Sequence, residues 1–169
     1  MDYLQWQDRL QEPRLGLMKF ILTKELGRLS KWLRILGFDT VYYNQDNLSS
    51  LIIHALRDER MILTRNQRLP QGRGLKIVLI KNEKIKKQVA EILQTLKISL
   101  KPEMMFSRCT LCNAELVDIA KEEVKDKVPE YVFKTQGNFI TCPQCKRVYW
   151  QGTHWGNVRK TLEEIKWNS

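Results

Sequence analysis

Four cysteines, arranged as two Cys-x-x-Cys pairs, constrain this chain more than any other feature of its sequence. The pairs are Cys109 with Cys112 and Cys142 with Cys145, and the 169 residues contain no other cysteine. Two thiolates three positions apart bind one ion when a tight turn lies between them, and two such turns complete the tetrahedral shell that zinc favours. We therefore predict a structural zinc ion, without an open coordination position for chemistry.

Three other uses of four cysteines fit this spacing less well. A disulfide framework suits a secreted chain, and no signal peptide precedes these residues. A thioredoxin-like redox motif has one Cys-x-x-Cys pair beside a βαβ unit, whereas this chain has two in a separate segment. Iron–sulfur proteins usually group their cysteines more closely along the sequence. With reduced thiols and no signal peptide, we expect a cytoplasmic protein.

The positive charge of the chain is concentrated outside the cysteine-containing segment. The net charge is +10, and residues 1–100 hold 18 Lys and Arg against 10 Asp and Glu, while residues 101–169 hold 11 against 9. An excess of this size predicts a polyanionic partner, most simply nucleic acid, although a soluble protein with a high pI is the alternative. No run of eighteen apolar residues is present, so we expect no membrane span.

The segment before the cysteines alternates between short apolar runs and amphipathic patterns. Leucines recur at spacings of three and four from Leu22 to Leu36, which predicts one apolar helix face, and Gly37 follows it as a typical C-terminal residue. Alternation of this kind predicts an α/β fold with a parallel sheet covered by helices. We expect strands at 18–22, 40–43, 61–64 and 76–80, and helices at 22–36, 48–57, 84–97 and 156–167.

Polar side chains follow the predicted strands, and ligands of such folds bind beyond the carboxyl ends of the strands. No glycine-rich phosphate loop follows any strand, so a dinucleotide or P-loop site is not expected. A metal-dependent phosphodiesterase would need several carboxylates around Mg²⁺ or Mn²⁺. Asp46 is the acid best placed for this role, with Glu25 and Glu83 as helpers, while Thr23 and Asn66 are neutral.

The first predicted helix carries a basic ridge opposite its leucines. Lys24, Arg28 and Lys31 lie within about 60° of one another at about 100° per residue, and Arg34 lies to one side. Arg65 follows the third predicted strand. A charged helix face is most often solvated surface, but its position beside the predicted cleft favours contacts with RNA phosphates at these five residues.

Several motifs resemble the Mut-seven C-terminal ribonuclease domain family. They are Leu26-Gly-Arg-Leu-Ser-Lys-Trp-Leu-Arg34, Ile62-Leu-Thr-Arg-Asn66, Ser107-Arg-Cys-Thr-Leu-Cys-Asn113 and the segment from Cys142 to Trp155, which contains Tyr-Trp-Gln-Gly-Thr-His-Trp. The resemblance covers residues 18 to about 165. It implies a PIN-like three-layer α/β domain with a parallel sheet, a small β-rich zinc ribbon, RNA as substrate class, and cleavage with a divalent metal.

The chain departs from the family pattern where the resemblance places the metal carboxylates. Thr23 stands where the family usually has Asp, and Asn66 closes a Thr-Arg-Asn run where the family has Thr-Arg-Asp, while Asp46 matches an acidic position. We therefore expect an RNA-binding protein on a ribonuclease scaffold. The alternative is an active ribonuclease that uses Asp46 with Glu25 or Glu83 and takes Mg²⁺ or Mn²⁺.

These features divide the chain into three parts. Residues 1–17 form an N-terminal extension, residues 18–100 the PIN-like domain, and residues 101–169 the four-cysteine module with a C-terminal helix. RNA is the expected partner, and a protein partner or a homo-oligomer remains open.

Overall fold

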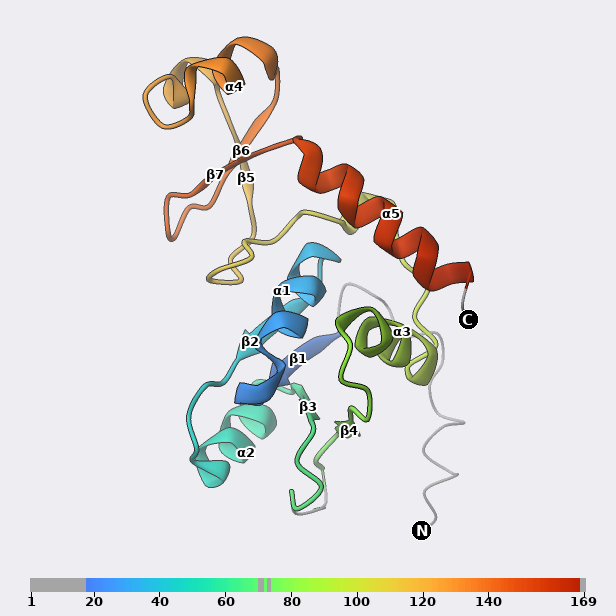
Figure 1. Ribbon diagram of the computed structural model, residues 1–169. Helices are drawn as coiled ribbons and strands as arrows, with labels where there is room; N and C mark the ends of the chain where they lie inside the picture. The colour runs from blue at the N-terminus through green and yellow to red at the C-terminus, as the bar shows by residue number, and fades with distance from the viewer. Residues whose placement is uncertain (1–17, 70–71, 73, 168–169) are drawn as a thin grey trace.

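The structure is a computed structural model that describes residues 18–69, 72 and 74–167. The predicted extension at residues 1–17 lies outside the described residues. Figure 1 shows a sheet domain at one end of the molecule, a small module at the other, and a long helix that runs back from the module to the sheet domain. None of the described helices is long and apolar enough to cross a membrane.

Four parallel strands form the sheet, as the alternating apolar runs predict. They are β1 (Lys19–Leu22), β2 (Asp39–Tyr42), β3 (Met61–Thr64) and β4 (Ile77–Leu79), in the order β2-β1-β3-β4. The central strand β1 pairs with both β2 and β3, so that Ile21 lies opposite Val41 on one side and Ile62 on the other. The chain goes from β1 to β2 on one side and then to β3 on the other side of β1. The topological switch point, where ligands bind in folds of this kind, therefore lies between β1 and β3.

Alternate residues of the strands point to opposite faces of the sheet, and each face is covered by helices. Phe20 and Leu22 pack with α1 (Gly27–Ile35) and α3 (Ile85–Thr95), whereas Ile21 and Ile62 pack with α2 (Leu48–Arg57). This arrangement gives the three layers expected of the α/β domain.

The first helix begins later than the leucine spacing predicts. A 3₁₀ turn, η3 (Lys24–Leu26), precedes α1, and Leu22 belongs to β1 instead of the helix. The reason is that Leu22 has strand neighbours on both sides, Tyr42 and Leu63, so the sheet hydrogen bonds fix an extended backbone there. Leu22 fits the helical spacing of the leucines only because it is also buried.

The four-cysteine module contains an antiparallel sheet and, among its described residues, three short helical segments. Its elements are η4 (Pro102–Met104), β5 (Val117–Ile119), η5 (Lys121–Val124), α4 (Glu130–Thr135), β6 (Phe139–Thr141) and β7 (Val148–Trp150). The strands lie in the order β5-β6-β7. Only four buried apolar side chains form the core of the described part of this module, namely Val124, Val128, Val132 and Phe139. A core of this size needs support from another source, such as a metal ion.

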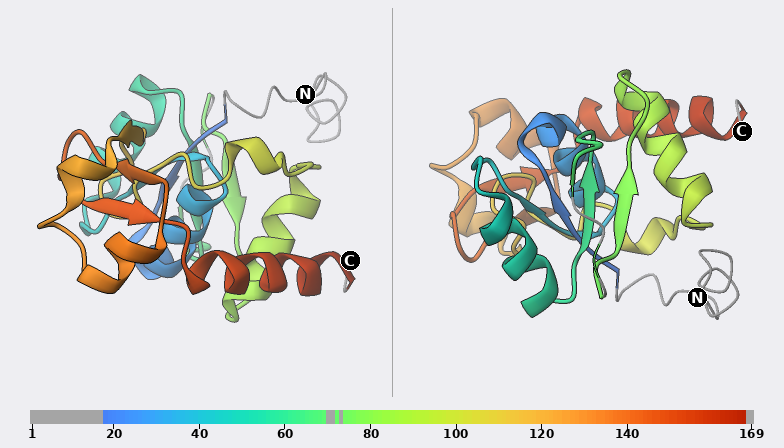
Figure 2. Two further views of the ribbon diagram at one scale, coloured as in Figure 1. Left: turned by 90° about the horizontal axis from the view of Figure 1, so that it is seen from above. Right: turned by 90° about the horizontal axis from the view of Figure 1, so that it is seen from below.

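The C-terminal helix packs on the sheet domain although its sequence follows the module. Helix α5 (Thr153–Trp167) buries Val158, Leu162 and Ile165 in the same apolar cluster as α1 and α3. Both views in Figure 2 place α5 alongside α3. The apolar face of this helix, which the sequence analysis groups with the four-cysteine module, therefore packs in the core of the larger domain.

Substitution of Gly37 tests the contact between the sheet domain and the four-cysteine module. Its φ is +93°, and a Cβ atom there would lie 2.3 Å from the carbonyl oxygen of Met104. We expect Gly37→Ala to lower the free energy of unfolding by about 1–3 kcal/mol or more, because the change adds both backbone strain and a clash. Urea denaturation measures this loss. Gly137→Ala is the matched control, since its Cβ would meet nothing within 4 Å, and equal losses in the two variants would contradict the account.

Candidate functional site

The four cysteine sulfurs gather at one point between the two turns of the module. All four Sγ atoms lie within 4.8 Å of one another, with Cys109 to Cys145 at 3.5 Å and Cys112 to Cys142 at 3.3 Å. A zinc ion with Zn–S bonds of about 2.3 Å has sulfur–sulfur edges of about 3.8 Å. The observed spacing and the all-sulfur donor set therefore fit one tetrahedral ion.

The two turns have the same backbone design, although they lie far apart in the sequence. In the first, the N–H of Asn113 donates to the carbonyl of Cys109, and in the second, the N–H of Lys146 donates to the carbonyl of Cys142. Asn113 and Lys146 both adopt positive φ, 71° and 61°. This conformation turns the chain directly after the second cysteine of each pair, so both sulfurs face the same point.

The electrostatics of the four thiol groups also favour a bound cation. Burial would raise the pKa of Cys109, but backbone N–H groups and the hydroxyl of Tyr149, 3.1 Å from its Sγ, lower it to about 6. Burial raises the pKa of Cys112 to about 12. Four thiolates this close repel one another, and a divalent cation is what allows all four to ionise together.

The first cysteine turn docks on the sheet domain through Arg34. This side chain is only 6% exposed, and its guanidinium donates to the carbonyls of Thr110 and Leu111 at 2.9 and 2.8 Å and to that of Thr40 at 2.9 Å. The sequence analysis expects Arg34 to contact RNA phosphates, whereas its guanidinium binds these three carbonyls in the structure. Because the carbonyls it binds lie in the turn between Cys109 and Cys112, Arg34 joins the metal cluster to the end of α1.

Asn113 makes a second connection between the modules. Its side-chain oxygen accepts from the N–H of Thr40 at 2.8 Å, and its amide nitrogen donates to Asp39 at 2.7 Å. Arg60 binds the same carboxylate with two N–H groups, at 2.7 and 3.2 Å. Although burial opposes ionisation, the bonds from Arg60 and Asn113 lower the pKa of Asp39, so the carboxylate is charged at neutral pH.

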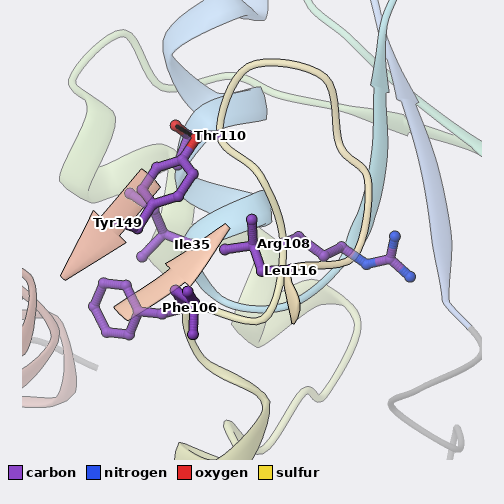
Figure 3. A pocket seen from close by; sticks show the side chains of 7 residues that line it. Ile35, Phe106, Arg108, Thr110, Leu116 and Tyr149 are labelled. Atoms are coloured by element: carbon purple, nitrogen blue, oxygen red, sulfur yellow. Dashed lines mark hydrogen bonds between the residues drawn. The ribbon is translucent and has the colours of Figure 1, made fainter. Parts of the chain in front are cut away.

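An apolar contact surrounds these polar bonds. Figure 3 shows Ile35 of α1 facing Phe106, Leu116 and Tyr149 around a small cavity of about 30 Å³. The N–H of Phe106 donates to the carbonyl of Ile35 at 2.7 Å, which extends the end of the helix into the module.

Thr23, Glu25 and Thr64 come together at the switch point between β1 and β3. One oxygen of Glu25 accepts from the hydroxyls of Thr23 at 2.6 Å and Thr64 at 3.2 Å and from the N–H of Arg65 at 2.9 Å. Burial would raise the pKa of Glu25, but these bonds outweigh it and lower the pKa. Thr23, which stands where the family usually has Asp, therefore belongs to a hydrogen-bonded group around the Glu25 carboxylate.

The other predicted acids do not join this group. Asp46 pairs with Lys24 at 2.5 Å, and Glu83 pairs with Arg65 at 3.1 Å. Within residues 18–69, 72 and 74–167, the four cysteines are the sole group of three or more His, Cys, Asp or Glu side chains placed to hold one ion. Asn66 uses its side-chain oxygen to accept from the N–H of Arg68 at 2.9 Å.

Two residues that the sequence analysis missed organise the loop after β4. Glu91 accepts from the N–H groups of Lys81 and Asn82 and from the Asn82 side chain, and Gln88 donates to the Asn82 carbonyl. Both residues lie on α3. A glutamate and a glutamine on a helix carry no local signal of this role, because their partners come earlier in the chain and from a loop.

Four of the five predicted RNA-binding side chains are exposed. Lys24, Arg28 and Lys31 lie on the solvent side of η3 and α1, and Arg65 lies at the strand end beside Glu25. Trp32 on α1 packs against the core on the opposite side. The basic ridge is thus accessible apart from Arg34.

Comparison with known protein families identifies the family of this chain. The model of the Mut7-C RNAse domain matches residues 18–162, which include both the sheet domain and the four-cysteine module. No curated protein matches the chain. The chain therefore belongs to the Mut7-C RNAse domain family, as its motifs predict.

The cluster predicts the consequence of losing one ligand. We expect Cys112→Ser to reduce bound zinc from one per chain to far below one and to unfold the module, since a structural zinc site contributes about 10–16 kcal/mol of apparent binding energy. Metal analysis and thermal unfolding of the variant measure both effects. Leu111→Ser is the control, because that side chain is 46% exposed between the two cysteines. A Cys112→Ser protein that keeps zinc and wild-type melting would contradict a structural site.

Proposed function

We propose that this member of the Mut7-C RNAse domain family binds RNA on a ribonuclease scaffold without cleaving it by metal-ion chemistry. The four cysteines hold zinc, which stabilises the module, and a reducing cytoplasm suits their thiolates. RNA lies against the basic side of η3 and α1 and reaches the strand ends at Arg65.

The observation that carries this proposal is the pairing of every acid near the strand ends. Glu25 is bound by two hydroxyls and one backbone N–H, Asp46 by Lys24, and Glu83 by Arg65. A two-metal site needs carboxylates that converge on a shared point and compensate the charge of the ions. Here the acids are spread among separate partners, and Thr23 and Asn66 supply no charge.

The basic ridge supports RNA as the ligand. Lys24, Arg28 and Lys31 present positive charge on one side of the first helical segment, and no acid of α1 lies among them. Phosphates bind such a surface without reading sequence, and the salt dependence of affinity reports how many phosphates are neutralised.

A metal-dependent ribonuclease is the second candidate, favoured by the family and by Asp46. The side chain of Asp46 is 81% exposed, so it is free to exchange Lys24 for a metal ion. In that case Asp46 would hold Mg²⁺ or Mn²⁺ together with Glu25 or Glu83, and the ion would activate water for attack on the phosphodiester.

One experiment separates the two candidates and tests the surface. Labelled single-stranded RNA is incubated with purified protein and Mg²⁺ or Mn²⁺, and both binding and cleavage are recorded. We expect binding without metal-dependent cleavage, and we expect Arg28→Glu combined with Lys31→Glu to weaken binding roughly tenfold and to reduce the salt slope by about 1.4. Lys125→Glu combined with Lys127→Glu makes the same change in charge on the four-cysteine module and should have little effect on affinity.

The contrary results are equally specific. Cleavage by the wild type that disappears in Asp46→Ala would establish the ribonuclease and overturn our proposal. An unchanged affinity in the Arg28 and Lys31 variant would show that RNA does not bind this surface.

A further inference from the structure

Helix α2 exposes apolar side chains on the face turned away from the sheet. Ile53 is 62% exposed, Leu56 46% and Leu48 39%, while Leu51 and Ala55 on the other side of the helix are buried. In Figure 1, α2 lies at the edge of the sheet domain, and none of the other described helices covers its outer side. No Lys, Arg, Asp or Glu occurs from residue 47 to residue 56.

The absence of charge excludes RNA as the occupant of this face, because phosphates require cationic groups. Contact between this apolar face and water is also unfavourable. An exposed apolar helix face with polar ends is instead typical of a contact between proteins.

The pattern of the outer face is complementary to itself. Ser49, Ile53 and Leu56 follow spacings of four and three, so they lie on one line along the helix. When two copies of α2 cross antiparallel about an axis between residues 52 and 53, the small Ser49 of each copy faces the large Leu56 of the other. Ile52 and Ile53 then meet their counterparts at the axis, and small opposite large allows close packing.

Each end of the helix carries one cation and one anion that form an ion pair. The ion pair of Lys24 and Asp46 precedes the helix, and the ion pair of Arg57 and Asp58 closes it, with nitrogen–oxygen distances of 2.5 and 2.7 Å. In the antiparallel arrangement each pair lies beside the other pair of the second copy. Asp46 then approaches Arg57 of the second copy, and Lys24 approaches Asp58 of the second copy.

We propose that two copies of this chain associate through the outer faces of α2 in an antiparallel, two-fold arrangement that places Arg57 of each copy beside Asp46 of the other. The contact joins the strand-end region of one copy to the second copy, since Asp46 follows β2. It is a separate proposal from RNA binding, although Lys24 takes part in both.

The size of the helix sets the strength of the association. A helix of ten residues buries less than the roughly 1,200 Å² of stable complexes, so we expect a weak dimer with a dissociation constant in the micromolar to millimolar range. The net charge of +10 opposes dimer formation by repulsion. Salt screens that repulsion and also the pairs between the two copies, so its net effect on the dimer is smaller than its weakening of RNA binding.

Sedimentation equilibrium of the full chain tests the contact between about 5 and 500 µM protein, a range set around that expected affinity. We expect the average mass to rise from 20.1 kDa toward twice that value as the protein concentration increases. Ile53→Glu should remain monomeric throughout, and its exposure ensures that the variant still folds. Tyr131→Glu is the matched control, because Tyr131 is 69% exposed on α4, and it should dimerise like the wild type.

The orientation of the two helices has its own test. Asp46→Lys and Arg57→Glu should each weaken the dimer, and the double variant should regain the wild-type constant, because the antiparallel pairing exchanges the two charges. A wild type that stays monomeric at all concentrations, equal losses in Ile53→Glu and Tyr131→Glu, or a double variant weaker than both single ones would overturn the proposal.

Discussion

The bonds between Arg34 and the first cysteine turn are the contact on which the arrangement of this molecule depends. The guanidinium is buried and reaches two carbonyls of the turn and one of β2. Carbonyls in a turn point in a fixed direction only when the turn is held. The Asn113 N–H bond to the Cys109 carbonyl closes this turn, and an ion bound by Cys109 and Cys112 would fix it further. A metal ion bound by the small module would therefore also support the end of α1 and the edge strand of the larger sheet.

The four-cysteine cluster and the strand-end group around Glu25 differ in how much of the fold depends on them. The four cysteines form a complete set of donors and connect two modules, so the loss of one would affect the fold of both. The strand-end residues connect only to one another, through Glu25 and its partners. Substitutions in this group would therefore leave the contacts between the two modules in place.

Much of the fold could be predicted from local patterns, and much of the site could not. The cysteine spacing was sufficient for the metal cluster, and short apolar runs were sufficient for the parallel sheet, because both signals act over a few residues. Arg34 lies on a basic helix, and nothing near it indicates that Thr110, 76 residues later, covers it. The hydroxyl partners of Glu25 are likewise far apart in sequence, since Thr23 follows β1 and Thr64 of β3 comes 41 residues later. Contacts between distant segments decide whether a charge serves the fold or a ligand, and a single sequence does not specify them.

The central claim, that the metal cluster organises the sheet domain through the first cysteine turn, is tested most directly by hydrogen exchange. The N–H of Thr40 donates to the Asn113 side chain across the joint, whereas the N–H of Ile62 donates to Lys76 within the sheet. We predict that removal of zinc by a chelator accelerates exchange at Thr40 about tenfold or more and leaves Ile62 nearly unchanged, because local opening exposes only the joint. An unchanged rate at Thr40, or an equal acceleration at both amides, would contradict the account.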